Sequence, residues 1–109
     1  MAIFIFFYGG DNILESKFQS DLKKEIKKEF PECIVTKLDS SCIQGIPDLL
    51  ILYKNKWATL ECKKESNSSH RPNQDYYVDK MNNMSFSRFV NPDNKKEVMK
   101  DLKLYFNGE

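Results

Sequence analysis

Two short segments of this chain carry side chains whose types and spacing can do chemistry. The first is Gly45-Ile46-Pro47-Asp48 and the second, after twelve intervening residues, is Glu61-Cys62-Lys63. Residues two apart in a strand point to the same face, so Glu61 and Lys63 are expected to lie side by side. Two carboxylates and a lysine on one face can hold a hard divalent cation beside a proton-handling amine. This combination is typical of metal-dependent phosphodiester hydrolysis.

The segment between the two acids predicts a β-hairpin that returns the chain to its starting point. Apolar residues 49–53 and 57–60 flank three polar residues, 54–56. If Tyr53 paired with Trp57, Glu61 would point to the wrong face of the sheet. A loop with an odd number of residues would therefore put the two carboxylates on opposite faces of the sheet. We expect a loop with an even number of residues, or a bulge that compensates for an odd one.

Two even loops remain open. A two-residue loop at Lys54-Asn55 places Asp48 directly opposite Glu61, whereas a loop at Asn55-Lys56 places Asp48 opposite Lys63, with Glu61 diagonal to it. Asn tolerates the left-handed backbone conformations that such tight turns require. Either loop brings the two acids and the lysine together.

The size and composition of the chain limit its domain number, its partners and its cellular compartment. Its 109 residues predict a single domain spanning 1–109. With 17 basic and 16 acidic residues, bulk charge does not argue for nucleic acid, so DNA affinity must come from local basic clusters. Three cysteines without C-x-x-C spacing predict free thiols in a reducing compartment. We therefore expect a cytoplasmic protein of a bacterium or, if viral, of the host cytoplasm or nucleus.

The first eight residues are almost wholly apolar. No basic residue precedes them, they are too short to span a bilayer, and no small-residue cleavage site follows. These features disfavour a signal peptide and a membrane anchor and predict a strand ending at Gly9-Gly10. Unpaired, such a strand could pair with another chain.

The remaining elements follow from hydrophobic spacing. After the N-cap pair Asp11-Asn12, apolar residues recur every four positions up to Pro31 and predict an amphipathic helix: Leu14, Phe18, Leu22, Ile26 and Phe30. A strand at 33–38, the hairpin, a polar loop at 65–73, a helix at 74–81 and a strand at 86–90 follow. In a last helix, Val98, Leu102 and either Tyr105 or Phe106 face inward. This order predicts an α/β (α+β) fold with a mixed central sheet flanked by helices.

This order, together with the motif, resembles the PD-(D/E)XK nuclease superfamily, and within it most closely the VRR-NUC nucleases and phage Holliday-junction resolvases of the endonuclease I type. The resemblance covers about residues 14–104. It rests on an ordered set: Glu15, the Gly-x-Pro-Asp turn at 45–48, the Glu-x-Lys strand at 61–63, Gln74 and the aromatic-rich strand at 86–90. Cys62 stands where an aliphatic residue is usual, and the N-terminal apolar segment is extra. The resemblance implies a restriction-endonuclease-like core.

The resemblance also implies a metal site. Asp48, Glu61 and the main-chain carbonyl of Cys62 would bind Mg²⁺, for which Mn²⁺ can substitute, and Glu15 would be a further metal or water ligand. The alternative for Asp48 and Glu61 is a pair of exposed carboxylates near lysines. Glu15 is otherwise a first-turn acid that complements the helix dipole.

Two further residues are assigned roles by the same resemblance. Lys63 would orient or help deprotonate the attacking water and stabilise charge on the phosphate. Its alternative role, a salt bridge to Glu61, is compatible with the first. Gln74 would support the lysine or the scissile phosphate, or else serve only as a polar group at a helix N-terminus.

Basic residues outside the motif are candidates for phosphate contact. These are Lys54 and Lys56 at the hairpin tip, Lys64, Arg71 and one edge of the Lys23–Lys28 cluster. Strand alternation turns Lys64 away from Lys63 unless the strand has ended. Most charge runs are solvated, so only a few contacts are expected, and binding should weaken steeply with salt.

The motif and the resemblance together predict a Mg²⁺-dependent DNA endonuclease. The resemblance to stand-alone resolvases of similar size implies branched DNA, such as a Holliday junction, as substrate. Symmetric cleavage of a junction needs two active sites and therefore implies a homodimer. The N-terminal apolar segment is the suspected contact. Alternatives left open are a nicking, flap-type repair or DNA-degrading nuclease, an RNA nuclease, and a non-catalytic nucleic-acid-binding module.

Overall fold

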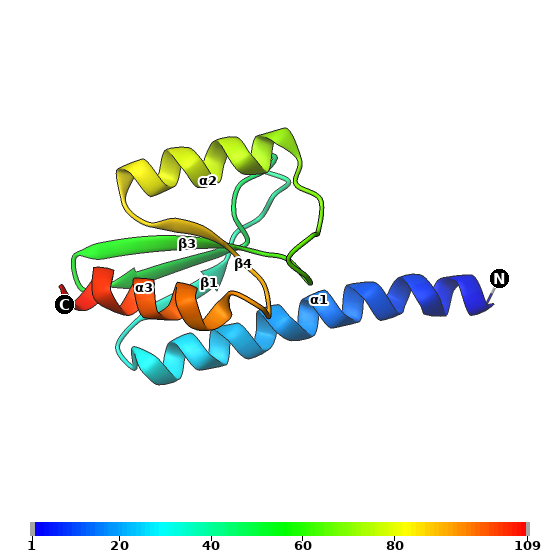
Figure 1. Ribbon diagram of the computed structural model, residues 1–109, viewed down its shortest axis with the longest axis horizontal. Helices are drawn as coiled ribbons and strands as arrows, with labels where there is room; N and C mark the ends of the chain where they lie inside the picture. Colours follow the sequence, from blue (N-terminus) through cyan, green and yellow to red (C-terminus); the bar gives the residue numbers. More distant parts are fainter. Residues whose placement is uncertain (1, 109) are drawn as a thin grey trace.

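The computed structural model describes the backbone of residues 2–108 and the side chains of residues 14–108. The elements are, in order, α1 (Ala2–Glu29), β1 (Ile34–Lys37), β2 (Leu49–Tyr53), β3 (Lys56–Cys62), α2 (Pro72–Met84), β4 (Ser87–Val90) and α3 (Lys95–Asn107). The strands form one mixed sheet in the order β1-β2-β3-β4, in which only the β3–β4 pair is parallel. Figure 1 shows α2 on one side of this sheet and α1 and α3 on the other. The predicted α+β architecture with a mixed central sheet is confirmed.

The predicted N-terminal strand is wrong, because α1 begins at Ala2 and continues through Gly9-Gly10 and the expected N-cap to Glu29. A short apolar run does not distinguish strand from helix by periodicity alone. A helix satisfies its backbone hydrogen bonds internally, and each glycine costs it only about 1 kcal/mol relative to alanine. Across residues 2–108, no helix has the length and apolar character needed to cross a membrane.

The C-terminal half of α1 packs against the sheet, whereas its N-terminal half extends beyond the sheet (Figure 1). Leu22, Ile26 and Phe30 are at most 1% exposed, which confirms the four-residue spacing there. Leu14 is 62% exposed, so its predicted inward position is wrong. The apolar residues spaced four apart continue toward the N-terminus in the sequence. At Leu14, however, the helix already lies beyond the edge of the sheet, so the sheet does not cover this side chain.

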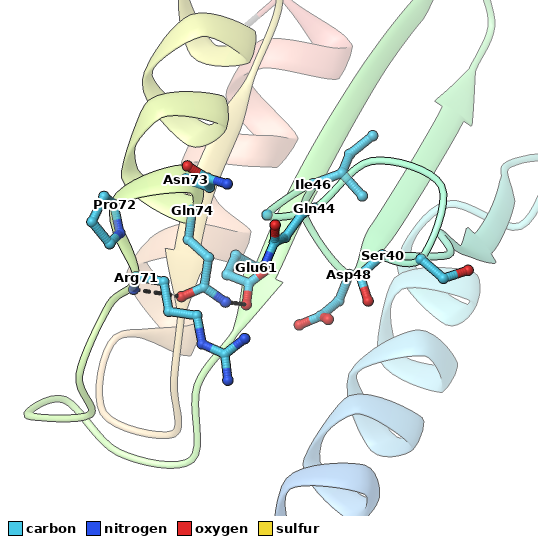
Figure 2. A pocket seen from close by; sticks show the side chains of 11 residues that line it. Ser40, Gln44, Ile46, Asp48, Glu61, Arg71, Pro72, Asn73 and Gln74 are labelled. Carbon is cyan, nitrogen blue, oxygen red and sulfur yellow. Dashed lines mark hydrogen bonds between the residues drawn. The ribbon is translucent and has the colours of Figure 1, made fainter.

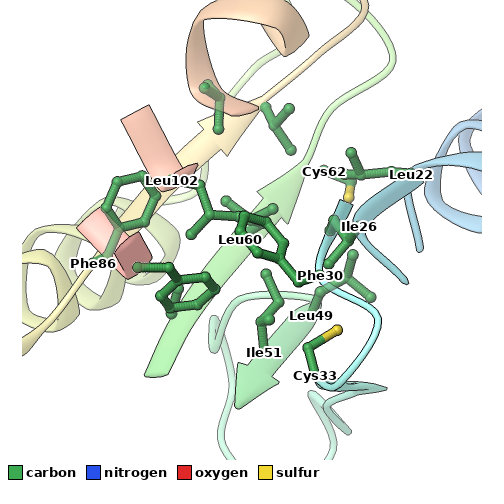
Figure 3. Close-up of a cluster of buried hydrophobic side chains, with 14 residues drawn as sticks. Leu22, Ile26, Phe30, Cys33, Leu49, Ile51, Leu60, Cys62, Phe86 and Leu102 are labelled. Atoms are coloured by element: carbon green, nitrogen blue, oxygen red, sulfur yellow. The ribbon is translucent and has the colours of Figure 1, made fainter. Parts of the chain in front are cut away.

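The main core lies between the sheet and the pair α1 and α3 (Figure 3). Leu49, Ile51 and Leu60 contribute from the strands, and Leu102 and Phe106 from α3. The choice left open between Tyr105 and Phe106 is thereby resolved, because Phe106 is buried and Tyr105 is only partly buried. On the opposite face, α2 packs against β3 and β4. β3 is thus covered on both faces, which makes it a rigid base for the residues at its end.

The hairpin register confirms the even loop. Leu49 pairs with Leu60 and Tyr53 pairs with Lys56, which leaves Lys54-Asn55 as the two-residue loop. The positive φ, 57°, falls on Lys54, whereas we expected Asn to take the left-handed conformation. Asp48 and Glu61 each lie one residue beyond the Leu49–Leu60 pair, so the register places them opposite each other.

A close approach fixes the loop that leads into β2. Gly45 has φ of 91°, a conformation that L side chains rarely adopt, and it packs against Asn73 in the first turn of α2. A Cβ atom at Gly45 would lie 2.4 Å from the Asn73 Cβ and 2.8 Å from its carbonyl carbon. The Gly45 position therefore joins the loop 39–47 to the beginning of α2.

Substituting Gly45→Ala should lower the free energy of unfolding by about 2–4 kcal/mol, as the sum of left-handed backbone strain and overpacking. Urea denaturation measures this change. Gly108→Ala is the matched control, because Gly108 has φ of 74° but nothing within 4 Å of an added Cβ. It should lose only the conformational part, about 1–2 kcal/mol. Equal losses in the two variants would show that the contact with Asn73 does not matter.

Candidate active site

Strand pairing brings the two predicted acids together at the end of the β2–β3 pair. Glu61 is only 5% exposed and Asp48 is half-buried. The backbone N–H of Cys62 donates a hydrogen bond of 2.8 Å to Asp48 Oδ2. The Asp48 carboxylate is therefore held against the strand that carries Glu61. Cys62 itself has a fully buried thiol, which agrees with its expected behaviour as a small core hydrophobe.

Glu61, Lys63 and Gln74 form one connected network. Lys63 Nζ lies 3.9 Å from Glu61 Oε2 and donates a 2.8 Å hydrogen bond to Gln74 Oε1. Gln74 Nε2 in turn donates to Glu61 Oε2 at 2.9 Å, as Figure 2 shows. The predicted side-by-side arrangement of Glu61 and Lys63 is confirmed. Gln74 therefore bridges the Glu61 and Lys63 side chains.

Gln74 also belongs to the N-terminal turn of α2. Its Oε1 accepts a 3.0 Å hydrogen bond from the backbone N–H of Arg71, the residue before Pro72 begins the helix. The helix begins two residues earlier than the sequence predicted, and proline at the first helical position suits this start. One side chain thus stabilises the helix start and also contacts Lys63 and Glu61, whereas its role toward a scissile phosphate stays a prediction.

The electrostatics of the site are dominated by the burial of its two carboxylates. The pKa of Glu61 is raised from 4.5 to about 8, first by burial and then by the charges of Asp48 and Glu15, against the opposing effect of Lys63. Burial also raises the pKa of Asp48, against the effects of the Cys62 N–H and the nearby lysines. A cation beside these carboxylates would favour their ionised forms.

Two cavities meet at the carboxylates. The larger, of about 670 Å³, we call the polar cavity; its distinguishing lining residues are Ser40, Ser41, Gln44, Gly45, Ile46, Pro72 and Asn73. The smaller, of about 370 Å³, we call the cationic cavity; its distinguishing lining residues are Glu15, Lys63, Lys64, Ser68 and Ser69. Asp48, Glu61, Arg71 and Gln74 line both cavities. The acids thus stand at the junction of two spaces of different chemistry.

Two residues whose positions were uncertain from sequence lie at the cationic cavity. Glu15 reaches it from α1 and acts electrostatically on Glu61. Lys64 lines the same cavity as Lys63, because β3 ends at Cys62 and the alternation of strand side chains no longer applies. Arg71 adds a guanidinium at the wall shared with the polar cavity.

The hairpin-tip lysines are not brought to this site. Lys56 begins β3 and lies five residues from Glu61, about 16 Å along the strand. Its Nζ donates a 2.6 Å hydrogen bond to the carbonyl of Tyr105 and sits over that ring. Lys54 lies in the loop beside it, with its Nζ over the Tyr53 ring. Their predicted contact with DNA is separate from the carboxylates.

Several residues of the site could not be anticipated from motif reasoning. Gln44 and Asn73 line the polar cavity, and the carbonyl of Ser69 accepts a 3.1 Å hydrogen bond from Lys63 Nζ. Gln44 and Asn73 lie directly next to residues of the ordered motif, Gly45 and Gln74. That adjacency was the only sequence signal available.

The donor set fits Mg²⁺ as an ion that keeps most of its waters. Within residues 14–108, no three His, Cys, Asp or Glu side chains converge in a metal-binding arrangement. Mg²⁺ is commonly held by one or two carboxylates and several waters, with no all-protein cage. The adjacent, poorly solvated Asp48 and Glu61 carboxylates meet this requirement. Glu15 lines the cavity without completing a three-carboxylate cluster.

Comparisons with known proteins add no constraint to this geometry. No protein-family model matches the sequence, and neither a curated protein nor a solved structure matches the chain. The functional argument therefore depends on the side chains that meet at the end of β3 and on the ordered motif that carries them.

Proposed function

We propose that this protein is a Mg²⁺-dependent DNA endonuclease of the PD-(D/E)XK superfamily, with a restriction-endonuclease-like core. One observation carries the proposal. Asp48, Glu61, Lys63 and Gln74, four residues singled out by the ordered motif, converge at one end of the sheet beside two open cavities. Placing two acids and a lysine in a poorly solvated cluster costs desolvation energy, and apolar side chains would serve a purely structural role at least as well.

In the proposed hydrolysis a water loses a proton and attacks the phosphorus of a DNA phosphodiester, while the P–O bond to one sugar oxygen breaks and that oxygen leaves with a proton from solvent. Bound by Asp48 and Glu61, Mg²⁺ would supply Lewis-acid stabilisation of the charge on the phosphoryl oxygens. The Lys63 ammonium has three N–H donors, of which two are used by Gln74 and the Ser69 carbonyl. Among the side chains of residues 14–108 Lys63 has no third hydrogen-bond partner, only the 3.9 Å ion pair with Glu61, so this N–H would be offered to a water or phosphate oxygen. Lys63 would thus orient the nucleophile and stabilise charge as it develops.

The cationic cavity supports a phosphate path that leads to the acids. Lys63 and Lys64 line its wall, and Arg71 lies at the border with the polar cavity. Their positive charges offset the three carboxylates that would otherwise repel a phosphodiester. A branched substrate such as a Holliday junction, and a homodimer that cuts it symmetrically, remain our first choices for the biological form.

Cleavage of a labelled four-way DNA junction and a linear duplex in Mg²⁺ tests the proposal directly. We expect Mg²⁺-dependent cleavage by the parent protein, faster on the junction, and a loss of at least ~10²-fold in Lys63→Ala, the scale of general acid–base assistance. Lys100→Ala, at an exposed position of α3, is the matched control and should cleave like the parent.

The possible results separate the candidate functions. Equal cutting of junction and duplex would support the nuclease activity but contradict specificity for junctions. It would favour a nicking, repair or DNA-degrading enzyme. Cleavage of RNA alone would change the substrate class. Binding without cleavage of DNA or RNA in Mg²⁺ or Mn²⁺ would contradict the enzyme and favour a nucleic-acid-binding module.

A further inference from the structure

The polar cavity is too neutral to be a second phosphate site. Apart from the shared residues, its wall consists of hydroxyls, amides and aliphatic groups, from Ser40, Ser41, Gln44, Ile46, Pro72 and Asn73. Arg71 is its only lining cation among the described residues and stands at the border with the cationic cavity. The chemistry of this wall suits an uncharged, flat group with hydrogen-bonding edges.

Two amides of the wall are available to a ligand. Within residues 14–108, neither the Gln44 nor the Asn73 side chain hydrogen-bonds to another protein group. Each amide offers both donors and an acceptor, as base edges require. Ile46 and Pro72 supply apolar surface of the kind that covers the faces of bases held in enzyme pockets. In Figure 2, Gln44, Ile46 and Asn73 lie on one side of the Gln74–Glu61 hydrogen bond, and the Arg71 guanidinium lies on the other.

The volume and rigidity of the cavity are also suited to one nucleotide. At about 670 Å³ it falls within the range of about 300–1,000 Å³ typical of small-molecule sites. The close packing of Gly45 on Asn73 joins its two walls, the loop 39–47 and the first turn of α2. A base in a duplex is stacked and paired, so it can enter such a cavity only by leaving the helix.

We propose that the polar cavity binds the unpaired base of a nucleotide next to the scissile phosphate, through the Gln44 and Asn73 amides. This inference rests on the proposed function for the position of the phosphate. It narrows the substrate class to strands whose bases leave the helix readily at the cleavage point, as at the branch point of a junction or at a flap. The phosphates lie on the lysine side of the acids and the base lies on the amide side.

Binding of two single strands of equal charge tests the proposal without requiring cleavage. The probes are a fluorescent oligodeoxythymidylate of about 12 residues and an abasic strand of the same length, within the size of known single-strand sites. Fluorescence anisotropy measures their affinities for the full chain in EDTA and in Ca²⁺, which takes the same type of oxygen ligand as Mg²⁺. The parent should bind the base-containing strand more tightly.

Alanine variants of the two amides then measure the contribution of the base to binding, separately from that of the phosphates. Asn73→Ala and Gln44→Ala should each weaken binding of the base-containing strand by about 5-fold, the worth of one net hydrogen bond, and leave abasic binding unchanged. Asn83→Ala, the same substitution at an exposed position of α2, should change neither affinity. Equal weakening for both strands, or no preference of the parent for bases, would overturn the inference.

Failure of this inference and failure of the proposed function give different results. Mg²⁺-dependent cleavage combined with equal binding of both strands would support the nuclease and contradict the base site. Base-dependent binding that is weakened by Asn73→Ala, in the absence of cleavage, would support the base site and contradict the nuclease.

Discussion

Asp48→Asn should reduce Mg²⁺-dependent phosphodiester cleavage by about 10²–10³-fold, the range seen when one preorganised electrostatic group is lost. The amide oxygen of Asn can still accept the hydrogen bond that Cys62 N–H donates to Asp48. The local fold should therefore persist while the negative charge disappears. Cleavage rates measured at saturating Mg²⁺ report the loss, and circular dichroism reports the fold.

The control for this variant is Asp79→Asn, which makes the same chemical change at an exposed position of α2. It should cleave at the parent rate. A second expectation sharpens the test, because a lost metal ligand also weakens the response to Mg²⁺. An Asp48→Asn protein that cleaves within a few-fold of the parent at every Mg²⁺ concentration would exclude Asp48 as a metal-binding residue.

The second large effect concerns the stability of the metal-free protein, which is expected to fall as pH rises from about 4.5 to about 8. Burial raises the pKa of Glu61 from 4.5 to about 8. Between these values folded Glu61 keeps its proton while the unfolded chain releases it, so the folded state binds more protons. The free energy of unfolding then decreases with rising pH. Each pKa unit corresponds to about 1.4 kcal/mol, so the total loss is a few kcal/mol.

Urea denaturation in EDTA at several pH values measures this slope in the parent and in Glu61→Gln. The glutamine variant should lose most of the pH dependence, and the remainder should come from Asp48, whose pKa burial also raises. Glu32→Gln, at an exposed position, is the matched control and should keep the parent slope. Identical slopes in the parent and Glu61→Gln would refute the assignment.

Mg²⁺ should reverse part of this loss. An ion that binds only the folded state stabilises it in proportion to its saturation. At pH 8, where ionised carboxylates are available, Mg²⁺ should raise the urea midpoint of the parent more than that of Glu61→Gln. An equal rise in both proteins would place the ion elsewhere.

The hairpin shows how far local rules reach. The parity of strand positions called for an even loop or a compensating bulge between Asp48 and Glu61, and the structure has an even loop, at Lys54-Asn55. Parity is a property of the backbone pleat, so it needs no knowledge of distant residues. The position of Glu61 beside Lys63 followed from the same rule.

The N-terminal segment shows where local rules stop. Its apolar run is compatible with a strand or a helix, and the spacing that continued to Leu14 suggested burial that the structure does not provide. Whether an apolar side chain is covered depends on where the sheet ends. That boundary is set by packing among elements far apart in the sequence.

The sequence by itself determined which acids and which lysine would meet, because strand alternation and hairpin parity act between near neighbours. Tertiary structure alone decided what surrounds them. It brought Lys64 into the cationic cavity by ending β3 at Cys62, and it directed Lys56 away to α3. It also placed Gln44 beside Asn73 by packing a loop against a helix that begins some 30 residues later, a contact selected by the shape of the whole core.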